Sequence, residues 1–347
     1  MNEVQRYLIE EFVEEYRERR MGRRELLRRA ALIMGGAAAA AAALREAERA
    51  LAAQPASRTR AGVWPTSLAD IASPERAAGT MPPAERTDAV VVAPDDPAIR
   101  AEMVTFPGEV GDVRGYLARP AMDGTFPGVV VIHENRGLIE PNMDIARRFA
   151  KAGYVALAPD LLSRVGGTEQ FADDLAQATG AIGRLGPDAP AADGNAAAAY
   201  LGTLPFVSGA VGAVGYCFGG GVVWRMGVRN PDLAAIVPYY GPPPPLDEVP
   251  NLRAAALGIY AELDSRINGA SEALWEALRA EDKTFEIWIA PGANHAFFNN
   301  TGANYAPEVA AEAWLRTLGW FDQYLGGRPL TEGQPGTEGG GAQPPQG

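Results

Sequence analysis

The sequence predicts an α/β protein with a mainly parallel central sheet and helices on both faces. Between residues 101 and 326, short apolar segments typical of buried strands alternate with longer segments that carry apolar residues at helical spacing. Alternation of this kind indicates a parallel sheet covered by helices. The chain has 347 residues, 47% of them hydrophobic, so it can bury one large core. A cysteine between two glycines, directly after one predicted strand, gives a third indication.

The predicted elements begin with a hairpin, 101–106 and 113–119, whose connection contains two glycines. Six further segments are short and apolar enough for strands: 128–133, 154–158, 210–215, 233–239, 256–261 and 284–290. Six longer segments are the predicted helices: 141–152, 168–184, 189–203, 219–229, 270–281 and 306–325. In the last helix, Trp314, Leu318, Phe321 and Leu325 share one face, which assigns them to the core.

Changes in composition divide the chain into four parts. Residues 1–53 are charged and then alanine-rich, and they lack a core-like pattern. Residues 54–100, rich in Pro, Ala and Asp, are expected to form a linker or wrapping extension. Residues 101–326 form the predicted α/β domain, and residues 327–347, rich in Gly, Pro, Gln and Thr, are expected to be a disordered tail.

Residues 1–53 have the pattern of a twin-arginine export signal. Arg23 and Arg24 precede two leucines and a mildly apolar, alanine-rich stretch that ends at Leu44. A membrane span needs about 20 apolar residues, so no stable span is expected in the mature chain. Export would place the protein in the periplasm or outside the cell, with cleavage after Ala52 or Ala53. The alternative is a helix that stays attached to a cytoplasmic protein.

The single cysteine of the chain, Cys217, lies in Gly215-Tyr216-Cys217-Phe218-Gly219. This is the pattern of a nucleophile elbow, in which the chain leaves a strand, turns sharply and enters a helix with the turn side chain exposed above the sheet. The glycines provide room for the close approach of strand and helix. Serine is the usual occupant, whereas this chain has a thiol. Taken alone, the motif is equally compatible with a small buried cysteine that only packs.

Asp264 and His295 complete a candidate catalytic triad. Asp264 follows the predicted strand 256–261, and His295, one of two histidines, follows the strand 284–290. The order nucleophile, acid, base along the chain is that of the α/β-hydrolases. An imidazole takes a thiol proton near neutral pH, and the carboxylate fixes its tautomer. The thiol is therefore expected to react at a pH below the ~8.5 of an ordinary cysteine.

Three residues are rival candidates for these roles. His133 ends an earlier strand and precedes the cysteine, at the position of the oxyanion loop in this fold. Asp160 also precedes the cysteine, and Glu262 lies two residues before Asp264. Capping a helix or bracing a loop is the alternative role for any single acid at a strand end.

The motifs resemble those of the dienelactone hydrolase family, the carboxymethylenebutenolidase-like branch of the α/β-hydrolases. The resemblance spans residues 100–326, and its matching segments are 131–137, 158–164, 215–220, Asp264 and 292–297. It implies an α/β-hydrolase fold, Cys217 as nucleophile, and Asp264 and His295 as its partners. It also implies that Glu134 holds or takes the thiol proton in the resting enzyme, although Glu134 could instead pair with Arg136.

The backbone amides of Asn135 and Phe218 are the oxyanion hole that the resemblance implies. The elbow supports this assignment independently, because it draws one donor from the residue after the nucleophile and another from the loop after an early strand.

The expected substrate-binding residues are Arg164, Arg136 and Tyr240. Arg164 matches an arginine that holds a substrate carboxylate in the family, although a surface salt bridge is the commoner role of a lone arginine. The family's second arginine after the catalytic histidine is absent, because residues 299–305 read Asn-Asn-Thr-Gly-Ala-Asn-Tyr. Arg136 is the alternative cation. Tyr240 follows a strand at the edge where ligands enter such sheets, so it is expected to line the pocket or to belong to a plain loop.

Charge and cysteine content exclude several functions. The net charge is −12, and residues after position 60 carry 19 basic against 34 acidic side chains (31 − 12 and 43 − 9). A nucleic-acid partner is not expected on such a surface. A single cysteine excludes intramolecular disulfides, and no Cys/His cluster has zinc-site spacing, so neither a metal nor another cofactor is expected. The sequence does not indicate an oligomeric state.

The expected function is cysteine-dependent hydrolysis of a small-molecule ester or lactone through an acyl-enzyme on Cys217. A thioesterase or general carboxylesterase on the same triad is the alternative among enzymes. A relative that binds a small molecule without catalysis, or that uses Cys217 as a redox sensor, is the alternative from another class.

Overall fold

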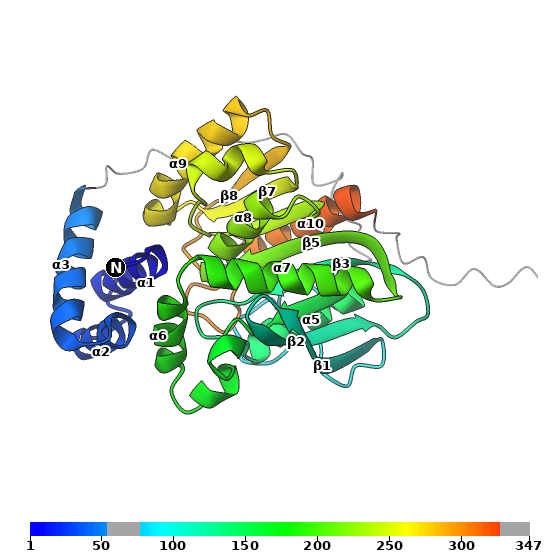
Figure 1. Ribbon diagram of the computed structural model, residues 1–347, viewed down its shortest axis with the longest axis horizontal. Helices are drawn as coiled ribbons and strands as arrows, with labels where there is room; N and C mark the ends of the chain where they lie inside the picture. Colours follow the sequence, from blue (N-terminus) through cyan, green and yellow to red (C-terminus); the bar gives the residue numbers. More distant parts are fainter. Residues whose placement is uncertain (54–76, 327–347) are drawn as a thin grey trace, which may run out of the picture.

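The computed structural model of the protein describes residues 1–53 and 77–326, and its centre is an eight-stranded sheet (Figure 1). The strand order is β1-β2-β4-β3-β5-β6-β7-β8. The strands are β1 (Ile99–Gly108), β2 (Gly111–Pro120), β3 (Phe126–Ile132), β4 (Val155–Pro159), β5 (Val207–Tyr216), β6 (Ala235–Tyr239), β7 (Ala255–Ala261) and β8 (Phe285–Ala290). Only β2 pairs antiparallel, with β1 and with β4, and the other neighbours are parallel. The predicted architecture and the predicted strands are confirmed.

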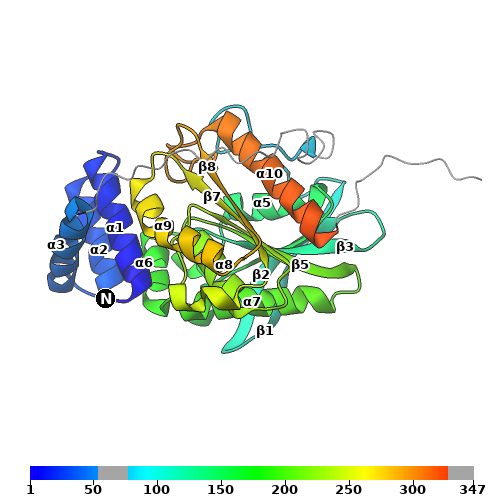
Figure 2. The same cartoon turned by 90° about the horizontal axis from the view of Figure 1, so that it is seen from above.

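Helices cover both faces of the sheet, and the core lies between them and the strands (Figure 2). Helices α5 (Glu140–Lys151) and α10 (Pro307–Leu325) lie on one face. Helices α7 (Asp188–Thr203), α8 (Phe218–Arg229) and α9 (Ser265–Ala280) lie on the other. The apolar face of α10 is buried as predicted, because Trp314, Leu318 and Phe321 are fully covered.

Two predicted helices differ from the structure, and in both an aspartate sets the boundary. The segment 168–184 is a 3₁₀ turn (Thr168–Phe171) followed by α6 (Leu175–Leu185), whose cap Asp174 accepts a hydrogen bond from the Ala176 amide. Helix α9 begins at Ser265, five residues before the predicted start, because Asp264 caps it. Side-chain acceptors at these positions satisfy amides that have no partner inside the helix.

Residues 1–53 form three helices that pack on the α/β domain next to α6 (Figures 1 and 2). They are α1 (Glu3–Arg17), α2 (Arg23–Met34) and α3 (Ala37–Ala53), called the N-terminal module below. The expectation that this segment lacks a core-like pattern is wrong, since Leu8, Ile9 and Phe12 are almost fully buried. These apolar residues recur at helical spacing, and the many Glu and Arg residues between them obscure the pattern.

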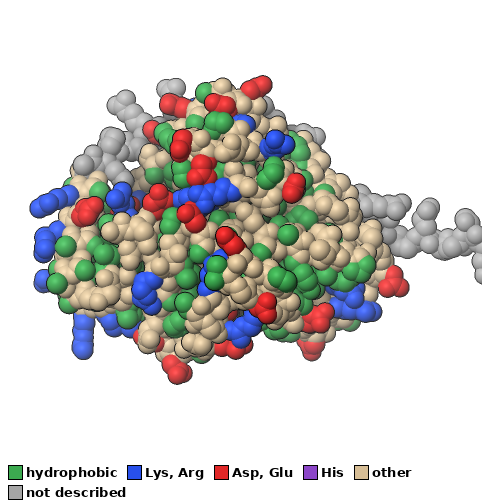
Figure 3. All heavy atoms as spheres, viewed as in Figure 1, with side chains coloured by type: hydrophobic (Ala, Val, Ile, Leu, Met, Phe, Trp, Pro, Cys, Tyr) green, Lys and Arg blue, Asp and Glu red, His purple; other side chains and the backbone are tan. Residues whose placement is uncertain are grey.

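Arginines are exposed on one face of the module, and no single helix in it could cross a membrane. Figure 3 shows Arg side chains on the visible face of these helices, where Arg23, Arg24, Arg45 and Arg49 are exposed. Among the described residues, no individual helix is both long and apolar enough for a span. Helices α2 and α3 pass that test only together, with a bend of 108° between them.

The structure describes the expected extension from residue 77 onward. Residues 77–98 pack over α5. The Asp144 carboxylate of α5 accepts hydrogen bonds from the amides of Val91 and Val92, and Arg148 donates to the carbonyl of Thr80. The start of the extension and the expected disordered tail, residues 54–76 and 327–347, lie outside the described residues.

Candidate active site

Cys217 lies on the sharp turn between β5 and α8. Its backbone has φ 57° and ψ −121°, a left-handed conformation that a residue with a side chain adopts only under strain. The turn is stabilised by a hydrogen bond of 3.1 Å from the Cys217 amide to the carbonyl of Tyr239 on β6. The predicted strand, strained turn and helix are therefore present.

Two glycines make this turn possible. A Cβ on Gly215 would lie 2.3 Å from the carbonyl oxygen of Gly219. A Cβ on Gly219 would lie 2.6 Å from the carbonyl oxygens of both Ile132 and His133. Contacts this short are not tolerated, so the two glycines are required by the close packing of α8 on the strands.

His295 and Asp264 are joined by a hydrogen bond of 2.5 Å between Nδ1 and Oδ2. Asp264 is fixed because its other oxygen, Oδ1, accepts from the amide of Ile267 in the first turn of α9. His295 lies in the loop after β8, and its Nε2 atom is buried without a hydrogen-bond partner. With Nδ1 bound to the carboxylate, Nε2 is the nitrogen that can accept a proton.

The structure brings His295 and Cys217 together. A nitrogen of His295 and Sγ of Cys217 lie within 4.8 Å of each other. Burial lowers the pKa of His295, but the Asp264 charge and hydrogen bond outweigh burial and raise that pKa well above its ordinary value. Burial raises the pKa of Asp264, but His295 outweighs it and lowers that pKa. The pair therefore favours an ionised carboxylate beside a basic imidazole.

The resting thiol is not of the activated kind that the sequence predicts. Burial raises the pKa of Cys217, and the negative charge of Glu11 raises it further, against the opposing effect of His295. The direction of the thiol pKa is therefore opposite to the one that the sequence predicts. The largest cause is burial of the thiol, and the second is the Glu11 carboxylate from the N-terminal module, which no local sequence pattern places near the thiol.

Two side chains of helix α1, Tyr7 and Glu11, lie against the nucleophile. The sequence motifs around Cys217 did not predict either of them. The Tyr7 hydroxyl is 3.2 Å from Cys217 Sγ, and the two Glu11 oxygens are 3.8 and 3.9 Å from it. The signal that could have found them is the amphipathic spacing of residues 3–17, which predicts a helix packed on another surface.

A cavity of about 420 Å³ opens at Cys217 between the N-terminal module and the α/β domain. Polar and charged side chains from both parts line it, among them Glu11, Glu15, Arg20, Asn135, Arg136 and Cys217. The cavity is therefore a composite of two parts of the chain that lie more than 100 residues apart in sequence.

Glu134 and Asn135 line the cavity at Cys217, and Phe218 directly follows the nucleophile in the chain. Among the described residues, Glu134 forms no hydrogen bond with Cys217. The Glu134 carboxylate accepts a hydrogen bond of 2.9 Å from Asn299, and burial raises its pKa. The Asn135 side chain donates to Glu11, with distances of 3.3 and 3.4 Å to the two oxygens. Phe218 is buried as the first residue of α8.

The three expected substrate-binding residues have different environments. Arg136 is exposed and lines the cavity at Cys217. The Tyr240 ring packs 4.9 Å from the His295 ring, and its hydroxyl is buried without a partner. Arg164 does not line this cavity, because Asp193 holds its guanidinium with two hydrogen bonds of 2.8 Å.

The rival candidates have structural roles. Both ring nitrogens of His133 are engaged, Nδ1 with the Glu134 carbonyl and Nε2 with the Leu161 amide. Asp160 accepts hydrogen bonds from the amide and hydroxyl of Thr168, and Glu262 accepts one from the Gly292 amide.

One cluster among the described residues has the composition of a metal site. Its members are Glu11, Cys217 and His295, whose ligand atoms lie within 4.8 Å of one another. A cation bound by this set would occupy both the nucleophile and the base, so it would inhibit attack by the thiol and not assist it.

The fold and this site define a hydrolase with an α/β-hydrolase fold. Residues 113–325 match the model of the dienelactone hydrolase family. The chain belongs to this family. The match covers most of the α/β domain and does not include the N-terminal module.

Individual relatives agree with this membership. The chain is 34% identical over 260 residues to a "Putative carboxymethylenebutenolidase" of Salmonella typhi, which covers 72% of this chain and 96% of the relative. It is also 34% identical over 289 residues to a protein of the same name from Methylorubrum extorquens, with 80% and 96% covered. A similar solved structure is that of a "Putative Dienelactone Hydrolase from Klebsiella pneumoniae", with 32% identity, a TM-score of 0.60, and 65% and 100% covered.

Proposed function

We propose that this hydrolase cleaves small-molecule esters or lactones through an acyl-enzyme on Cys217. The observation that carries the proposal is the buried His295, bound to Asp264 through Nδ1, with Nε2 free and within reach of the thiol. Nucleophile, base and orienting acid in this relation are the arrangement that acyl transfer requires.

In the proposed reaction, His295 Nε2 takes the thiol proton while Sγ attacks the carbonyl carbon. The carbonyl electron pair moves to oxygen, which the amides of Phe218 and Asn135 stabilise. The leaving oxygen then takes the proton from His295, and water releases the acyl group by the same steps. Removal of one oxyanion donor from such a site costs about 3 kcal/mol of transition-state stabilisation.

The alternative of a redox-sensing relative has less support. Sensor cysteines are exposed and have a low pKa, because the thiolate is the species that oxidants attack. Cys217 is 3% exposed, and its surroundings raise its pKa. A thioesterase or general carboxylesterase would use the same three residues, so substrate tests must separate these activities.

The proposal is tested by turnover of three substrates on purified full-length protein: p-nitrophenyl acetate, a small lactone and an acyl thioester. We expect hydrolysis of the ester and the lactone, with loss of turnover in Cys217→Ala and no loss of folded protein. Turnover that persists in Cys217→Ala would refute the cysteine mechanism, and preference for the thioester would favour the thioesterase.

Export of the chain by the twin-arginine route stays a prediction. Arg23 and Arg24 at the start of α2 support it, whereas the packing of the N-terminal module on the α/β domain supports a retained segment. Mass spectrometry of the protein from separated cell compartments distinguishes a chain that begins at Met1 from one that begins near Ala53.

A further inference from the structure

Helix α1 places one hydroxyl group and one carboxylate against the nucleophile. The Tyr7 hydroxyl lies 3.2 Å from Cys217 Sγ, which is hydrogen-bond distance for sulfur. Glu11 is one helical turn further along, so it shares a face of α1 with Tyr7 and reaches the same sulfur at 3.8 Å. Both Tyr7 and Cys217 are buried, at 7% and 3% exposure.

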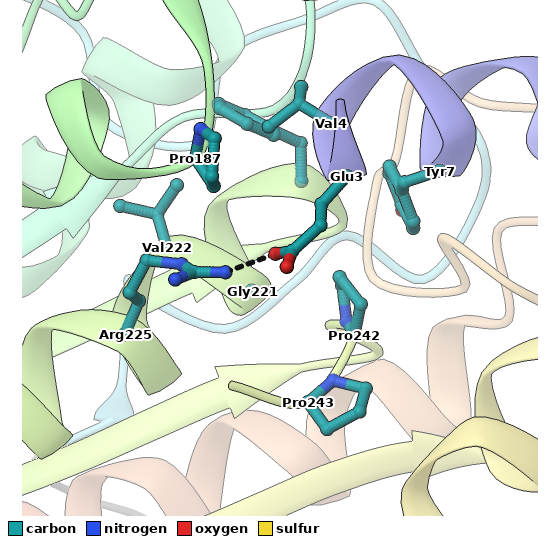
Figure 4. A pocket seen from close by; sticks show the side chains of 10 residues that line it. Glu3, Val4, Tyr7, Pro187, Gly221, Val222, Arg225, Pro242 and Pro243 are labelled. Carbon is teal, nitrogen blue, oxygen red and sulfur yellow. Dashed lines mark hydrogen bonds and ion pairs between the residues drawn. The ribbon is translucent and has the colours of Figure 1, made fainter. Parts of the chain in front are cut away.

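The start of α1 is anchored to α8, the helix that begins directly after the nucleophile. Glu3 forms an ion pair with Arg225 of α8, as Figure 4 shows. At the other end of α1, Glu14 accepts a hydrogen bond of 3.1 Å from Arg266. The Arg266 guanidinium also lies 4.8 Å from the centre of the Tyr7 ring. The Tyr7 side chain is therefore held in its position from several sides.

Tyr7 contacts Cys217 and also lines a second cavity. This second cavity, of about 200 Å³, lies between α1 and the start of α8, and Tyr7 and Phe218 both line it (Figure 4). A substrate carbonyl carbon under attack by Sγ would lie near the Tyr7 hydroxyl, because that hydroxyl is 3.2 Å from the sulfur. No other hydroxyl among the described residues is paired with the sulfur.

We propose that Tyr7 is a catalytic residue that donates its hydroxyl hydrogen bond to Cys217 Sγ and stabilises the thiolate. The proposal rests on the proposed function. The thiol proton moves to His295 Nε2, Sγ forms its bond to the carbonyl carbon, and Tyr7 keeps its own proton throughout. In the resting state the thiol donates to Glu11, whose carboxylate Asn135 also holds.

The phenol is suited to act only as a donor. Burial raises the pKa of Tyr7 well above its ordinary value, and the neighbouring Cys217 and Glu11 add to the effect. The hydroxyl therefore keeps its proton at neutral pH. A hydrogen bond to an anion is stronger than one to a neutral group, so the donor favours the thiolate over the thiol.

The test compares Tyr7→Phe with Tyr16→Phe, a control on the exposed end of the same helix. Tyr7→Phe keeps the ring against Arg266 and removes only the donor. We expect kcat/KM for p-nitrophenyl acetate to fall about tenfold or more, with no change in Tyr16→Phe. If α1 merely blocks the site, Tyr7→Phe leaves kcat/KM unchanged or raises it, which would overturn the proposal.

A second readout does not depend on turnover. The pH at which iodoacetamide labels Cys217 should rise in Tyr7→Phe, because a stabilising donor is lost. It should fall in Glu11→Gln, because a negative charge beside the sulfur is lost. General loosening of α1 would move both variants in the same direction, which would contradict the proposal.

The labelling experiment also separates this proposal from the proposed function. If the two variants shift the labelling pH in opposite directions but the protein hydrolyses no ester, the contact of Tyr7 with Cys217 is supported. Only the proposed hydrolysis is then refuted. Should Tyr7→Phe fold poorly, a ring-fluorinated tyrosine at position 7 keeps the contact and makes the phenol a stronger donor. It should lower the labelling pH, and an unchanged labelling pH would overturn the role of Tyr7.

Discussion

Arg164 donates two hydrogen bonds of 2.8 Å to the carboxylate of Asp193, which is 1% exposed. The paired hydrogen bonds raise the pKa of Arg164, so the guanidinium stays charged and bound to Asp193. A buried carboxylate without its cation is costly, which makes the pair a structural feature between the turn after β4 and helix α7.

Arg164→Ala is therefore expected to destabilise the fold without changing substrate preference. It leaves Asp193 buried and unpaired, which costs about 3 to 5 kcal/mol. Urea unfolding measures this loss, and kcat/KM for a carboxylated lactone relative to its methyl ester measures preference. A collapse of that ratio in Arg164→Ala, with stability retained, would return Arg164 to the substrate site.

Arg136 is the residue whose removal should change that ratio. It is exposed at the cavity that contains Cys217, and it forms no ion pair within the described part of the chain. A charged hydrogen bond contributes about 1.5 to 3 kcal/mol, so Arg136→Ala should lower kcat/KM for the carboxylated lactone by about tenfold or more. The methyl ester serves as the internal control, and an equal loss for both substrates would argue against carboxylate recognition.

The local parts of the site could be predicted from sequence, because each depends on a short segment. Cys217 between two glycines, and Asp264 and His295 each after a strand, follow from the alternation of strands and turns. The parallel sheet then places the carboxyl ends of its strands at one edge. The positions of these three residues needed no information on distant contacts.

Contacts between segments remote in sequence could not be predicted in this way. Tyr7 and Glu11 reach a residue more than 200 positions away, and no local pattern specifies which surface an amphipathic helix covers. Burial of the thiol raises its pKa against the expected direction, and Glu11 adds to this effect. The motif around Arg164 is typical of substrate binding, but the Arg164 guanidinium instead pairs with Asp193, which lies on α7.

Gly219→Ala should abolish the fold of the active-site turn. The new Cβ would lie 2.6 Å from two backbone carbonyl oxygens that cannot move without displacing β3. We expect a loss of about 4 kcal/mol or more in unfolding free energy. The matched control is Gly269→Ala in α9, where nothing lies within 4 Å and alanine should add about 0.5 to 1 kcal/mol. Similar stabilities for the two variants in a thermal melt would contradict the tight packing at the elbow.

His295→Ala and His133→Asn should have very different effects on turnover. His295 has a free Nε2 beside the thiol, so its loss should reduce kcat by several orders of magnitude, as for other members of a catalytic unit. His133 has both nitrogens engaged with backbone groups, and asparagine can replace part of that bonding. We expect substantial activity in His133→Asn. Equal losses of kcat, with both variants folded, would leave the identity of the base open.

The activity should rise with pH across the neutral range. The base acts only when His295 is unprotonated, and Asp264 raises the pKa of His295 well above its ordinary value of about 6.5. The pKa of Cys217 is also raised, through burial and then through Glu11, so thiolate formation favours high pH as well. A plot of kcat/KM for a neutral ester against pH should therefore increase through a midpoint above about 6.5.

Glu11→Gln should move the rising part of this pH profile to lower pH, because one negative charge beside the sulfur is removed. Glu134→Gln is the matched control: the Glu134 charge acts on the thiol in the same direction but more weakly than Glu11, so its shift should be smaller. A larger shift in Glu134→Gln would mean that Glu134, and not Glu11, is the carboxylate that controls the thiol.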